Sequence, residues 1–371
     1  MNNNIEINKG CPLLDYQISV DTDGTLYPCC HTYNYKFDNL ADIRDWQREQ
    51  KQQFSKNEWP DACFICKSRE QNAGFSERIQ SHLTYKYDPQ TATPEVKDLQ
   101  VAYKNLCNLS CIMCGVNGSS SIYDYITVNS SFPVNWNWDI TKHVKLNEKN
   151  IEFILDAAPT LQNITLLGGE PFLIKEYITI LDKLPDSCAV LVVTNGTIYN
   201  QQFINHLKKF KELTIMFSID GYGIVNEALR FNSKWPIIEK NVLRIKKEFP
   251  NAFIGLCPTW TNFNIFHWKS LYEWSHQIGL YDAQVFWQNV ITYPEHLKLC
   301  YISNEWKDYI LSHCEDEILL SMLSSWINEP QTENMTGVKT QWSLLKDIGL
   351  TKGFDYENLF PHIYKDFNTF Q

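Results

Sequence analysis

The sequence lacks features that would place it in several large classes of protein. It has no apolar run near the roughly 18 residues of a membrane-spanning helix, and its start, MNNNIEINKGC, lacks the basic and apolar segments of a secretion signal. Basic residues are scarce, with 33 Lys and Arg against 43 Asp and Glu and a formal net charge of −10. Because nucleic-acid affinity needs dense Lys and Arg, we expect no nucleic-acid partner, no membrane partner and a cytoplasmic location.

Glycine is also sparse, at 15 of 371 residues, whereas cysteine is abundant, at 12. With 44% hydrophobic residues, a chain of this length can bury a large core, which excludes disordered and fibrous classes. Without a secretion signal, the thiols are expected to stay reduced, and clustered reduced cysteines more often bind metal than form disulfides. Most of the cysteines fall into two groups along the chain.

Strand-like apolar runs alternate with amphipathic segments between residues 97 and 300. This alternation predicts an α/β fold with a parallel sheet. Six strands fit a partial, TIM-like (β/α)6 barrel better than a closed eight-stranded one. The predicted strands are 99–103, 163–168, 189–194, 213–219, 253–260 and 283–288, and the predicted helices are 147–158, 175–184, 200–211, 235–249 and 265–278.

Three regions are predicted along the chain. Residues 1–95 form a small cysteine-rich module that begins with a hairpin around Gly24. The proline-containing segment KYDPQTATPE ends this module. Residues 96–300 form the partial barrel, and residues 301–371 form a helical C-terminal extension to which the sequence assigns no chemistry.

The first cysteine group follows the first barrel strand. Cys107, Cys111 and Cys114 lie in KNLCNLSCIMCG with the spacing C-x3-C-x2-C. Three soft thiolates this close suit an iron–sulfur cluster or zinc. The missing fourth local ligand would leave the metal an open position, as in catalytic zinc sites. Three buried structural cysteines, or a zinc knuckle, are the alternatives.

Together with the GGEP segment one βα unit later, this motif resembles the radical S-adenosylmethionine (radical SAM) enzymes. The resemblance implies that the three cysteines hold a [4Fe–4S] cluster whose open iron binds the amino and carboxylate groups of SAM. An electron from a flavodoxin- or ferredoxin-type reductant would then cleave SAM to a 5′-deoxyadenosyl radical that abstracts hydrogen from a substrate.

The resemblance also implies SAM contacts at the strand ends. Glu170 would accept from the SAM ammonium group, Arg230 would bind its carboxylate, and Met113 would pack against its adenine. An ordinary turn is the alternative for GGEP, ordinary caps or surface residues are the alternative for the others, and Asp220-Gly221 is predicted to be a turn. The implied SAM-contacting residues are Gly168, Gly169, Glu170, Pro171, Thr194, Asn195, Ser218, Arg230 and Met113.

The second cysteine group lies in the N-terminal module. Cys11, Cys29, Cys63 and Cys66 are predicted to form a four-thiolate site, since C-x2-C at a helix start puts both sulfurs on one face. Ligand chemistry alone leaves zinc and iron–sulfur open. Cys30 is an alternative to Cys29 rather than an additional ligand, because adjacent residues on a strand face opposite ways. His31 is a further alternative ligand.

The G-x4-C hairpin, the C-x2-C motif and the segment EQNAGFSER resemble the twitch or SPASM-type auxiliary modules of radical SAM enzymes, as does FWQNVITYPEHL at residues 286–297. The resemblance implies one auxiliary iron–sulfur cluster, with [4Fe–4S] favoured over [2Fe–2S]. It implies a peptide or protein substrate whose side chains are crosslinked, epimerised or oxidised, with a small-molecule oxidoreductase as the alternative. A non-catalytic zinc-binding interaction protein is the rival from another class. No catalytic acid or base is predicted, and the remaining cysteines, 188, 257, 300 and 314, are expected to be structural.

Overall fold

The computed structural model describes residues 5–74, 76–123, 143–280, 282, 289–313, 327, 331 and 335–364. The chain divides into two compact units. Unit 1 comprises Met1–Asn105, His143–Val192 and Asn200–Leu213, and unit 2 comprises Leu106–Lys142, Val193–Tyr199 and Thr214–Gln371. The boundaries differ from the three predicted regions, which remain a prediction.

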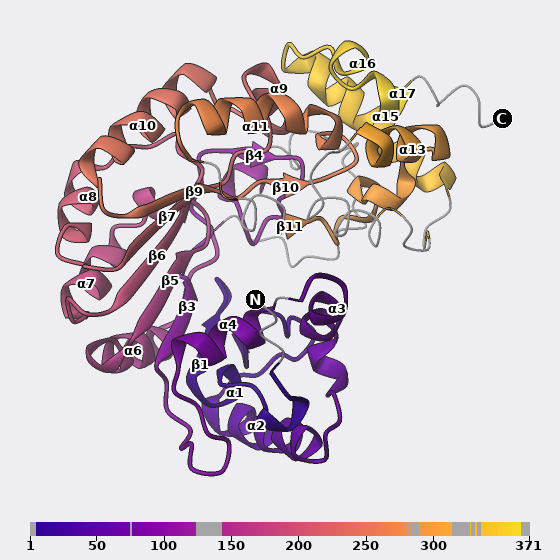
Figure 1. Cartoon of the computed structure of the whole chain (residues 1–371). Coiled ribbons are helices and arrows are strands. Elements are labelled where there is room, and N and C mark those ends of the chain that lie inside the picture. Colours follow the sequence, from indigo (N-terminus) through magenta and orange to yellow (C-terminus); the bar gives the residue numbers. More distant parts are fainter. Residues whose placement is uncertain are drawn as a thin grey trace. The chain divides into compact units, whose positions relative to one another are not determined.

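The main sheet has seven strands in the order β2-β1-β3-β5-β6-β7-β9 (Figure 1). Apart from the antiparallel pair β1–β2, the registered pairs β1–β3, β3–β5, β5–β6 and β7–β9 are parallel. Among the described residues the sheet ends at β2 and β9, so the predicted α/β class with an open, partial barrel is confirmed. The strands are β1 Gln17–Val20, β2 Leu26–Tyr27, β3 Asp98–Ala102, β5 Asn163–Leu167, β6 Ala189–Thr194, β7 Leu213–Phe217 and β9 Phe253–Leu256.

Five of the six predicted barrel strands correspond to β3, β5, β6, β7 and β9. The fifth is shorter than predicted, because Pro258 separates β9 from the short strand β10 (Thr259–Trp260) and cannot donate to a ladder. The sixth, 283–288, lies outside the described residues. Two-residue strands form two small sheets: β4 (Ser110–Cys111) pairs with β8 (Arg230–Phe231), and β10 pairs with β11 (Asn289–Val290).

Strand β1 shows how the N-terminal hairpin joins the sheet. The predicted turn is present, with Gly24 at φ +88°. The other edge of β1 pairs in parallel with β3, from Gln17 opposite Asp98 to Val20 opposite Val101. All four β1 residues are buried, as expected for a strand with neighbours on both edges. The hairpin is therefore a part of the parallel sheet in unit 1.

Helices follow the strands of unit 1 as predicted, and asparagine side chains begin two of them. Asn147 accepts from the backbone N–H of Asn150 at the start of α6, and Asn200 accepts from Gln202 and Phe203 at the start of α8. In β3 and β5 every second side chain is fully buried and the others are partly exposed. The helices of unit 1 are α1 Leu13–Tyr16, α2 Leu40–Ser55, α3 Phe64–Ala73, α4 Glu77–Thr84, α6 Glu148–Ala157, α7 Glu176–Lys183 and α8 Gln201–Leu207, with 3-10 helices η1 Ile7–Lys9, η2 Asp61–Cys63, η3 Ala158–Thr160 and η4 Pro171–Leu173.

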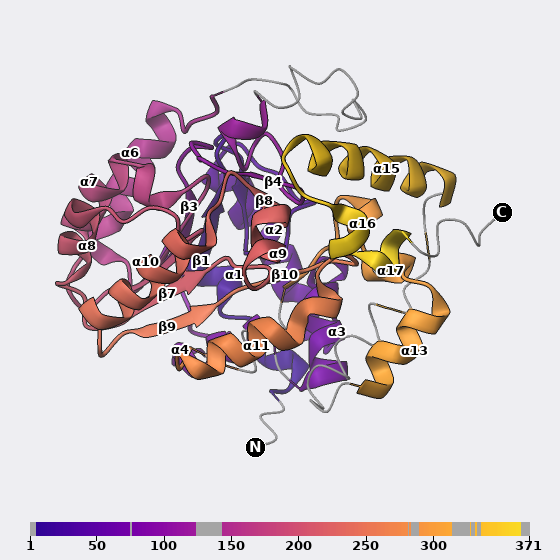
Figure 2. The same ribbon diagram turned by 90° about the horizontal axis from the view of Figure 1, so that it is seen from above.

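The predicted helical C-terminus is present and contributes to the core of unit 2. Val338 and Trp342 of α15, together with Phe360, pack in one apolar cluster with Leu229 of α9, and α15, α16 and α17 lie together in Figure 2. No helix in the described part of the chain is long and apolar enough to cross a membrane. The helices of unit 2 are α9 Ile224–Leu229, α10 Trp235–Glu248, α11 Trp268–Gln277, α13 Asn304–His313, α15 Met335–Thr351, α16 Tyr356–Leu359 and α17 Pro361–Tyr364, with 3-10 helices η5 Ile265–His267, η6 Glu295–Leu297 and η7 Leu299–Tyr301.

Candidate metal centres and cofactor site

The three cysteines of the C-x3-C-x2-C motif form one group of interacting sulfurs in unit 2. Cys111 ends the short strand β4, and a tight turn carries the backbone N–H of Cys114 to within 3.1 Å of the Cys111 carbonyl oxygen. The thiol of Cys111 donates to the sulfur of Cys114, which lowers the pKa of Cys114 and raises that of Cys111. The charge of Cys107 also acts on Cys114. The local backbone therefore brings together the three thiols that the sequence singled out.

Asn195 connects the loop after β6 to the first of these cysteines. Its Nδ2 atom lies 3.9 Å from Cys107 Sγ and 3.1 Å from Asn108 Oδ1, while Asn108 Nδ2 donates to Thr197 Oγ1 at 2.8 Å. Asn195 was predicted as a SAM contact, and its hydrogen bonds give it a structural role beside Cys107. Sequence reasoning missed Asn108, which gives no signal apart from its place next to a cysteine.

Arg230 is the neighbour of a second cysteine. The pairing of β4 with β8 places Arg230 directly opposite Cys111. Its Nη1 lies 3.8 Å from Cys111 Sγ, and its Nε donates to Asp220 Oδ2 at 2.6 Å. Asp220 was predicted only as part of a turn, because nothing in its sequence context indicates a buried ion pair.

The other predicted SAM contacts of unit 2 lie near the ends of β6 and β7 or beside Cys114. The backbone N–H of Ser218 donates to the Thr194 carbonyl oxygen at 2.8 Å. Met113 is partly buried and packs against the apolar cluster that includes α15. None of these contacts tests binding of SAM, so their role in binding remains a prediction.

In unit 1, the GGEP segment makes a tight turn against the end of β3. Gly168 has φ +81°, and a Cβ added there would lie 2.9 Å from the Lys104 carbonyl oxygen. The backbone N–H of Gly169 donates to that same oxygen at 3.0 Å. Glu170 is fully buried, and its Oε1 accepts from the Phe172 N–H at 3.1 Å, where Pro171 begins η4. The turn therefore requires glycine at 168, and it carries a buried carboxylate.

The N-terminal module brings five thiols together within unit 1. Burial raises the pKa of Cys11 to about 12 and also raises the pKa values of Cys63 and Cys66, and the charges of the neighbouring sulfurs, with that of Glu77 at Cys66, add to the effect. The neighbours that act on Cys63 include Cys11, Cys29 and Cys66. All four predicted ligands therefore lie within electrostatic reach of one another. Cys63 is the residue before α3, and Cys66 lies in the first turn of that helix.

Cys29 and Cys30 correct one expectation. They were expected to face opposite ways on a strand, but β2 ends at Tyr27 and both residues lie in the following turn. A hydrogen bond between their side chains lowers the pKa of Cys29 to about 6 and raises that of Cys30. Side chains alternate between two faces only within a strand, and these two residues follow the strand. Because their thiols are hydrogen-bonded to each other, both belong to the same group.

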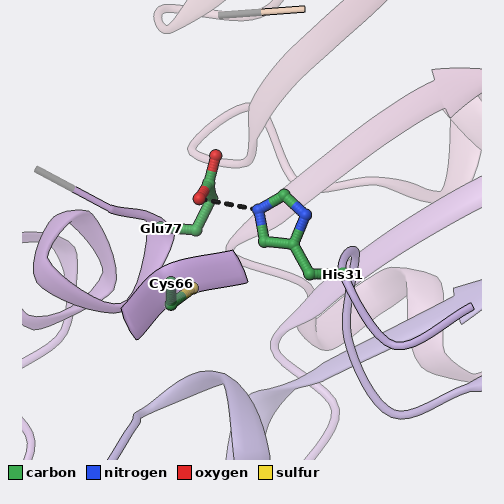
Figure 3. A group of neighbouring side chains, drawn as sticks. All are labelled: His31, Cys66 and Glu77. Carbon is green, nitrogen blue, oxygen red and sulfur yellow. Dashed lines mark ion pairs between the residues drawn. The ribbon is translucent and has the colours of Figure 1, made fainter. Parts of the chain in front are cut away.

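Beside this group lies a polar cluster of His31, Cys66 and Glu77 (Figure 3), whose ligand atoms are all within 4.8 Å of one another. His31 Nε2 is 2.6 Å from Glu77 Oε2, and Arg69 also pairs with Glu77. Burial favours the neutral carboxyl, but the hydrogen bond from His31 and the nearby positive charges hold the pKa of Glu77 at about 2. Because Arg69 already places a cation on Glu77, the cluster is better suited to support Cys66 than to bind a separate metal ion.

Arg78 anchors the chain around Cys11. Its side chain is 1% exposed and makes a two-point contact with Glu70, through Nε at 2.9 Å and Nη2 at 2.8 Å. The same guanidinium donates to the carbonyl oxygens of Gly10 at 2.9 Å and Ile5 at 2.8 Å. Sequence reasoning missed this role, although Glu70 and Arg78 are the first and last residues of the EQNAGFSER segment.

Outside the two groups, Cys188 and Cys300 are fully buried, as expected for structural residues. Cys257 was also expected in the core, but it is only partly buried, and its sulfur accepts from Asn289 Nδ2 at 2.7 Å. Cys314 lies outside the described residues.

Two family models match the chain in the places where the thiols gather. Residues 102–274 match the radical SAM superfamily, and residues 11–67 match the iron–sulfur cluster-binding SPASM domain. No curated protein sequence shows a match. The chain therefore contains a radical SAM region and carries a SPASM or twitch-type segment ahead of it. Both matches imply iron–sulfur clusters, and the first implies SAM.

Solved structures give weaker similarities. Native anSMEcpe with bound AdoMet and Cp18Cys peptide is 16% identical with a TM-score of 0.36, and the match covers 49% of this chain and 48% of that one. Streptococcus suis SuiB bound to its precursor peptide SuiA is 13% identical with a TM-score of 0.38, and the match covers 68% of this chain and 60% of that one. The match thus spans about half the length of anSMEcpe.

Proposed function

We propose that this radical SAM enzyme binds its SAM-cleaving [4Fe–4S] cluster through Cys107, Cys111 and Cys114. The observation that carries the proposal is that the radical SAM match contains three thiols that the fold gathers into one group. Three soft sulfur ligands fit an iron–sulfur cluster and leave one iron without a protein ligand. Cys107 also accepts N–H groups from Asn195 and Leu109, contacts suited to a thiolate.

When bound, the cluster supplies the electron that cleaves SAM to the 5′-deoxyadenosyl radical. The residues of this chain would bind SAM and orient it. Glu170 would accept a hydrogen bond from the SAM ammonium group. The Gly168–Gly169 turn would allow the backbone to approach SAM closely, because glycine has no Cβ. Asn195 would hold the Cys107 loop in place. Thr194, Ser218, Met113 and Pro171 would complete the SAM site.

We propose that Cys11, Cys29, Cys63 and Cys66 hold one auxiliary cluster, of the [4Fe–4S] rather than the [2Fe–2S] type. The chemistry of the donor set fits, because the site offers four thiols within electrostatic reach of one another and a fifth, Cys30, hydrogen-bonded to Cys29. Most of these thiols are protonated without metal because of burial, so cluster assembly would release protons. In this proposal the auxiliary module comprises residues 1–95, the radical SAM barrel comprises residues 96–300, and the helical extension comprises residues 301–371.

We propose a peptide or protein substrate from which the radical takes a hydrogen atom, leading to a crosslink, an epimerised residue or an oxidised side chain. The support is the resemblance to auxiliary-cluster radical SAM enzymes. A flavodoxin- or ferredoxin-type protein would supply the electron. A small-molecule oxidoreductase remains the second candidate, because the resemblance includes enzymes of that kind.

The test is to purify the protein without oxygen, add SAM and dithionite, and measure 5′-deoxyadenosine by chromatography. Cys107→Ala, Cys111→Ala and Cys114→Ala should each abolish this product, because each removes one of three ligands. The matched control is Cys300→Ala, which removes a buried thiol of the same unit. Full cleavage by all three variants would contradict the proposal, as would wild-type protein that carries zinc and no iron.

The auxiliary site is tested separately by Cys63→Ala combined with Cys66→Ala. Iron content should fall by about one cluster while SAM cleavage survives, since separate thiolates hold the two sites. The matched control here is Cys188→Ala. Unchanged iron in the double variant would contradict the auxiliary assignment. Peptides and small molecules can then be compared as substrates by their ability to promote 5′-deoxyadenosine formation in the wild type.

A further inference from the structure

The antiparallel pair β4–β8 fixes a cationic side chain next to one of the proposed cluster ligands. The two strands contain only two residues each, with Ser110 opposite Phe231 and Cys111 opposite Arg230. The backbone N–H of Ile112 also donates to the Leu229 carbonyl oxygen at 3.0 Å, which extends the contact by one residue. Directly opposite residues have Cβ atoms about 5 Å apart. The position of Arg230 relative to Cys111 is therefore set by the backbone and does not depend on a flexible side chain alone.

Asp220 also contacts the guanidinium of Arg230. Its Oδ2 accepts from Arg230 Nε at 2.6 Å, and its Oδ1 accepts from the Thr259 N–H at 2.8 Å. The Asp220 backbone is fixed as well, since its N–H donates to Asn226 Oδ1 and its carbonyl oxygen accepts from Asn264 Nδ2, both at 2.9 Å. The carboxylate of Asp220 is fully buried. An aspartate fixed by these three contacts, besides the one to Arg230, can hold Arg230 in one orientation.

The guanidinium of Arg230 remains charged although it is buried. Burial alone would lower the pKa of Arg230, but Asp220 and the Cys111 sulfur outweigh it and raise this pKa above its usual value. Charges act more strongly on one another where water is excluded. A cation at 3.8 Å from Cys111 Sγ, backed by an anion, is therefore a fixed source of electric field at that sulfur.

We propose that Arg230 is a positioning residue that hydrogen-bonds the Cys111 thiolate and raises the reduction potential of the SAM-binding cluster, while Asp220 orients it and limits the rise. This inference rests on the proposed function, because it requires Cys111 to be a cluster ligand. Hydrogen bonds and positive charges at cluster sulfurs stabilise the reduced, more negative state. The prediction that Arg230 binds the SAM carboxylate is compatible with this role, since a guanidinium has five N–H donors and these two contacts use Nε and Nη1.

The proposal predicts opposite effects from two substitutions. Arg230→Gln removes the positive charge, so the cluster should become harder to reduce. Asp220→Asn removes the opposing negative charge and keeps the shape of the side chain, so the cluster should become easier to reduce. A merely structural role would shift neither potential or would shift both in one direction through loss of packing.

The experiment is a redox titration of the reconstituted protein without SAM, followed by electron paramagnetic resonance. The Cys63→Ala, Cys66→Ala double variant serves as the background, so that the auxiliary cluster does not contribute to the signal. We expect Arg230→Gln to shift the equilibrium constant for one-electron reduction at least tenfold toward the oxidised cluster, about 59 mV. Asp220→Asn should shift it measurably toward the reduced cluster. Arg244→Gln is the matched control, because Arg244 is exposed on α10 and lies over the Tyr199 ring.

Unchanged potentials in both variants, or shifts of the same sign, would overturn the inference while leaving the proposed function intact. A background protein that binds no iron at the C-x3-C-x2-C motif would overturn the proposed function and this inference with it. If Arg230→Gln cannot be loaded with iron, two other variants take its place in the test. Arg230→Lys retains the positive charge, and Asp220→Asn retains Arg230 itself. A potential in Asp220→Asn that equals or lies below that of the background protein would then reject the proposal.

Discussion

The side chains of Cys29 and Cys30 are hydrogen-bonded to each other, although the two residues are consecutive in the chain. Cys29 is the acceptor, and it lies within electrostatic reach of Cys11, Cys63 and Cys66. Cys30 contacts Cys29 and feels the charges of Glu77 and Cys66. The module therefore has one more thiol than a four-ligand site needs, and the contacts favour Cys29 as the ligand.

A pair of single substitutions distinguishes the two thiols. Cys29→Ala should lose the auxiliary cluster, because it removes the thiol that interacts electrostatically with the other three proposed ligands. Cys30→Ala should retain it, because Cys30 is hydrogen-bonded to Cys29 and is an additional thiol beyond the four proposed ligands. Iron and sulfide content, measured anaerobically and compared with the Cys188→Ala control, checks this expectation. The reverse pattern would make Cys30 the ligand.

Arg78 gives a prediction for the stability of the module. Arg78→Ala should destabilise the protein by about 3 kcal/mol, since it removes the cation from the partly buried carboxylate of Glu70 and leaves Ser76 as a remaining donor. It should also speed loss of the auxiliary cluster to a chelator, because the Gly10 carbonyl next to Cys11 loses its Arg78 donor and is left with His82. Urea unfolding and iron release measure the two effects.

The matched control is Arg48→Ala. Arg48 pairs with Asp45 on the surface, where the two side chains are 68% and 70% exposed. Such substitutions usually change the free energy of unfolding by less than about 0.5 kcal/mol. If the two variants lost equal stability, the buried contacts of Arg78 would not be the cause.

Gly168→Ala tests the turn that carries Glu170. The new Cβ would lie 2.9 Å from the Lys104 carbonyl oxygen and 3.1 Å from Ala102 Cα, at φ +81°. We expect the free energy of unfolding to fall by more than the roughly 1–2 kcal/mol that left-handed backbone strain alone would cost. We also expect SAM to bind more weakly, as measured by calorimetry. Gly353→Ala isolates the strain, because Gly353 has φ +85° and open space around it. Equal losses in both variants would show that the close approach to β3 is unimportant.

Two buried histidines predict sensitivity to acid. Burial lowers the pKa of His296 to about 4 and that of His362 to about 3, whereas an unfolded histidine titrates near 6.5. Above pH ~6.5 both states are neutral, so these groups add no pH dependence. As the pH falls below that value, the unfolded state binds protons that the folded state excludes, and stability drops by about 1.4 kcal/mol per pH unit for each histidine until its folded pKa is reached.

Urea unfolding between pH 5 and 6.5 measures this slope. His362→Asn should reduce it by one histidine's share, and the exposed His276→Asn provides the control for the substitution itself. An unchanged slope in His362→Asn would show that His362 takes up a proton in the folded protein.

The barrel strands could be predicted because their signal is local. In β3, β5 and β6 buried and partly exposed side chains alternate, and the sequence shows the apolar runs directly. The parallel pairing of β1 with β3 could not be predicted, because it joins residues about 80 positions apart and a four-residue strand with two apolar side chains fits many partners equally well.

The candidate sites were predictable in their ligands and not in their surroundings. The spacing of the cysteines in the sequence indicates that they are ligands. The residues that contact those thiols depend on tertiary structure and cannot be predicted from spacing. Arg230 faces Cys111 through strands of two residues each, too short to leave a periodic pattern. Arg69 and Glu77 look like ordinary charged residues of a polar helix until α3 and α4 bring them to His31.

The pairing of β1 with β3 has a consequence for any attempt to study the barrel without its first 95 residues. Removing β1 would expose the backbone N–H and C=O groups along one side of β3, in a segment whose Leu99 and Val101 are fully buried. Bare apolar strand edges recruit other chains and promote aggregation. A truncated protein that precipitates would therefore reveal a missing edge partner, and its inactivity would say nothing about the auxiliary cluster.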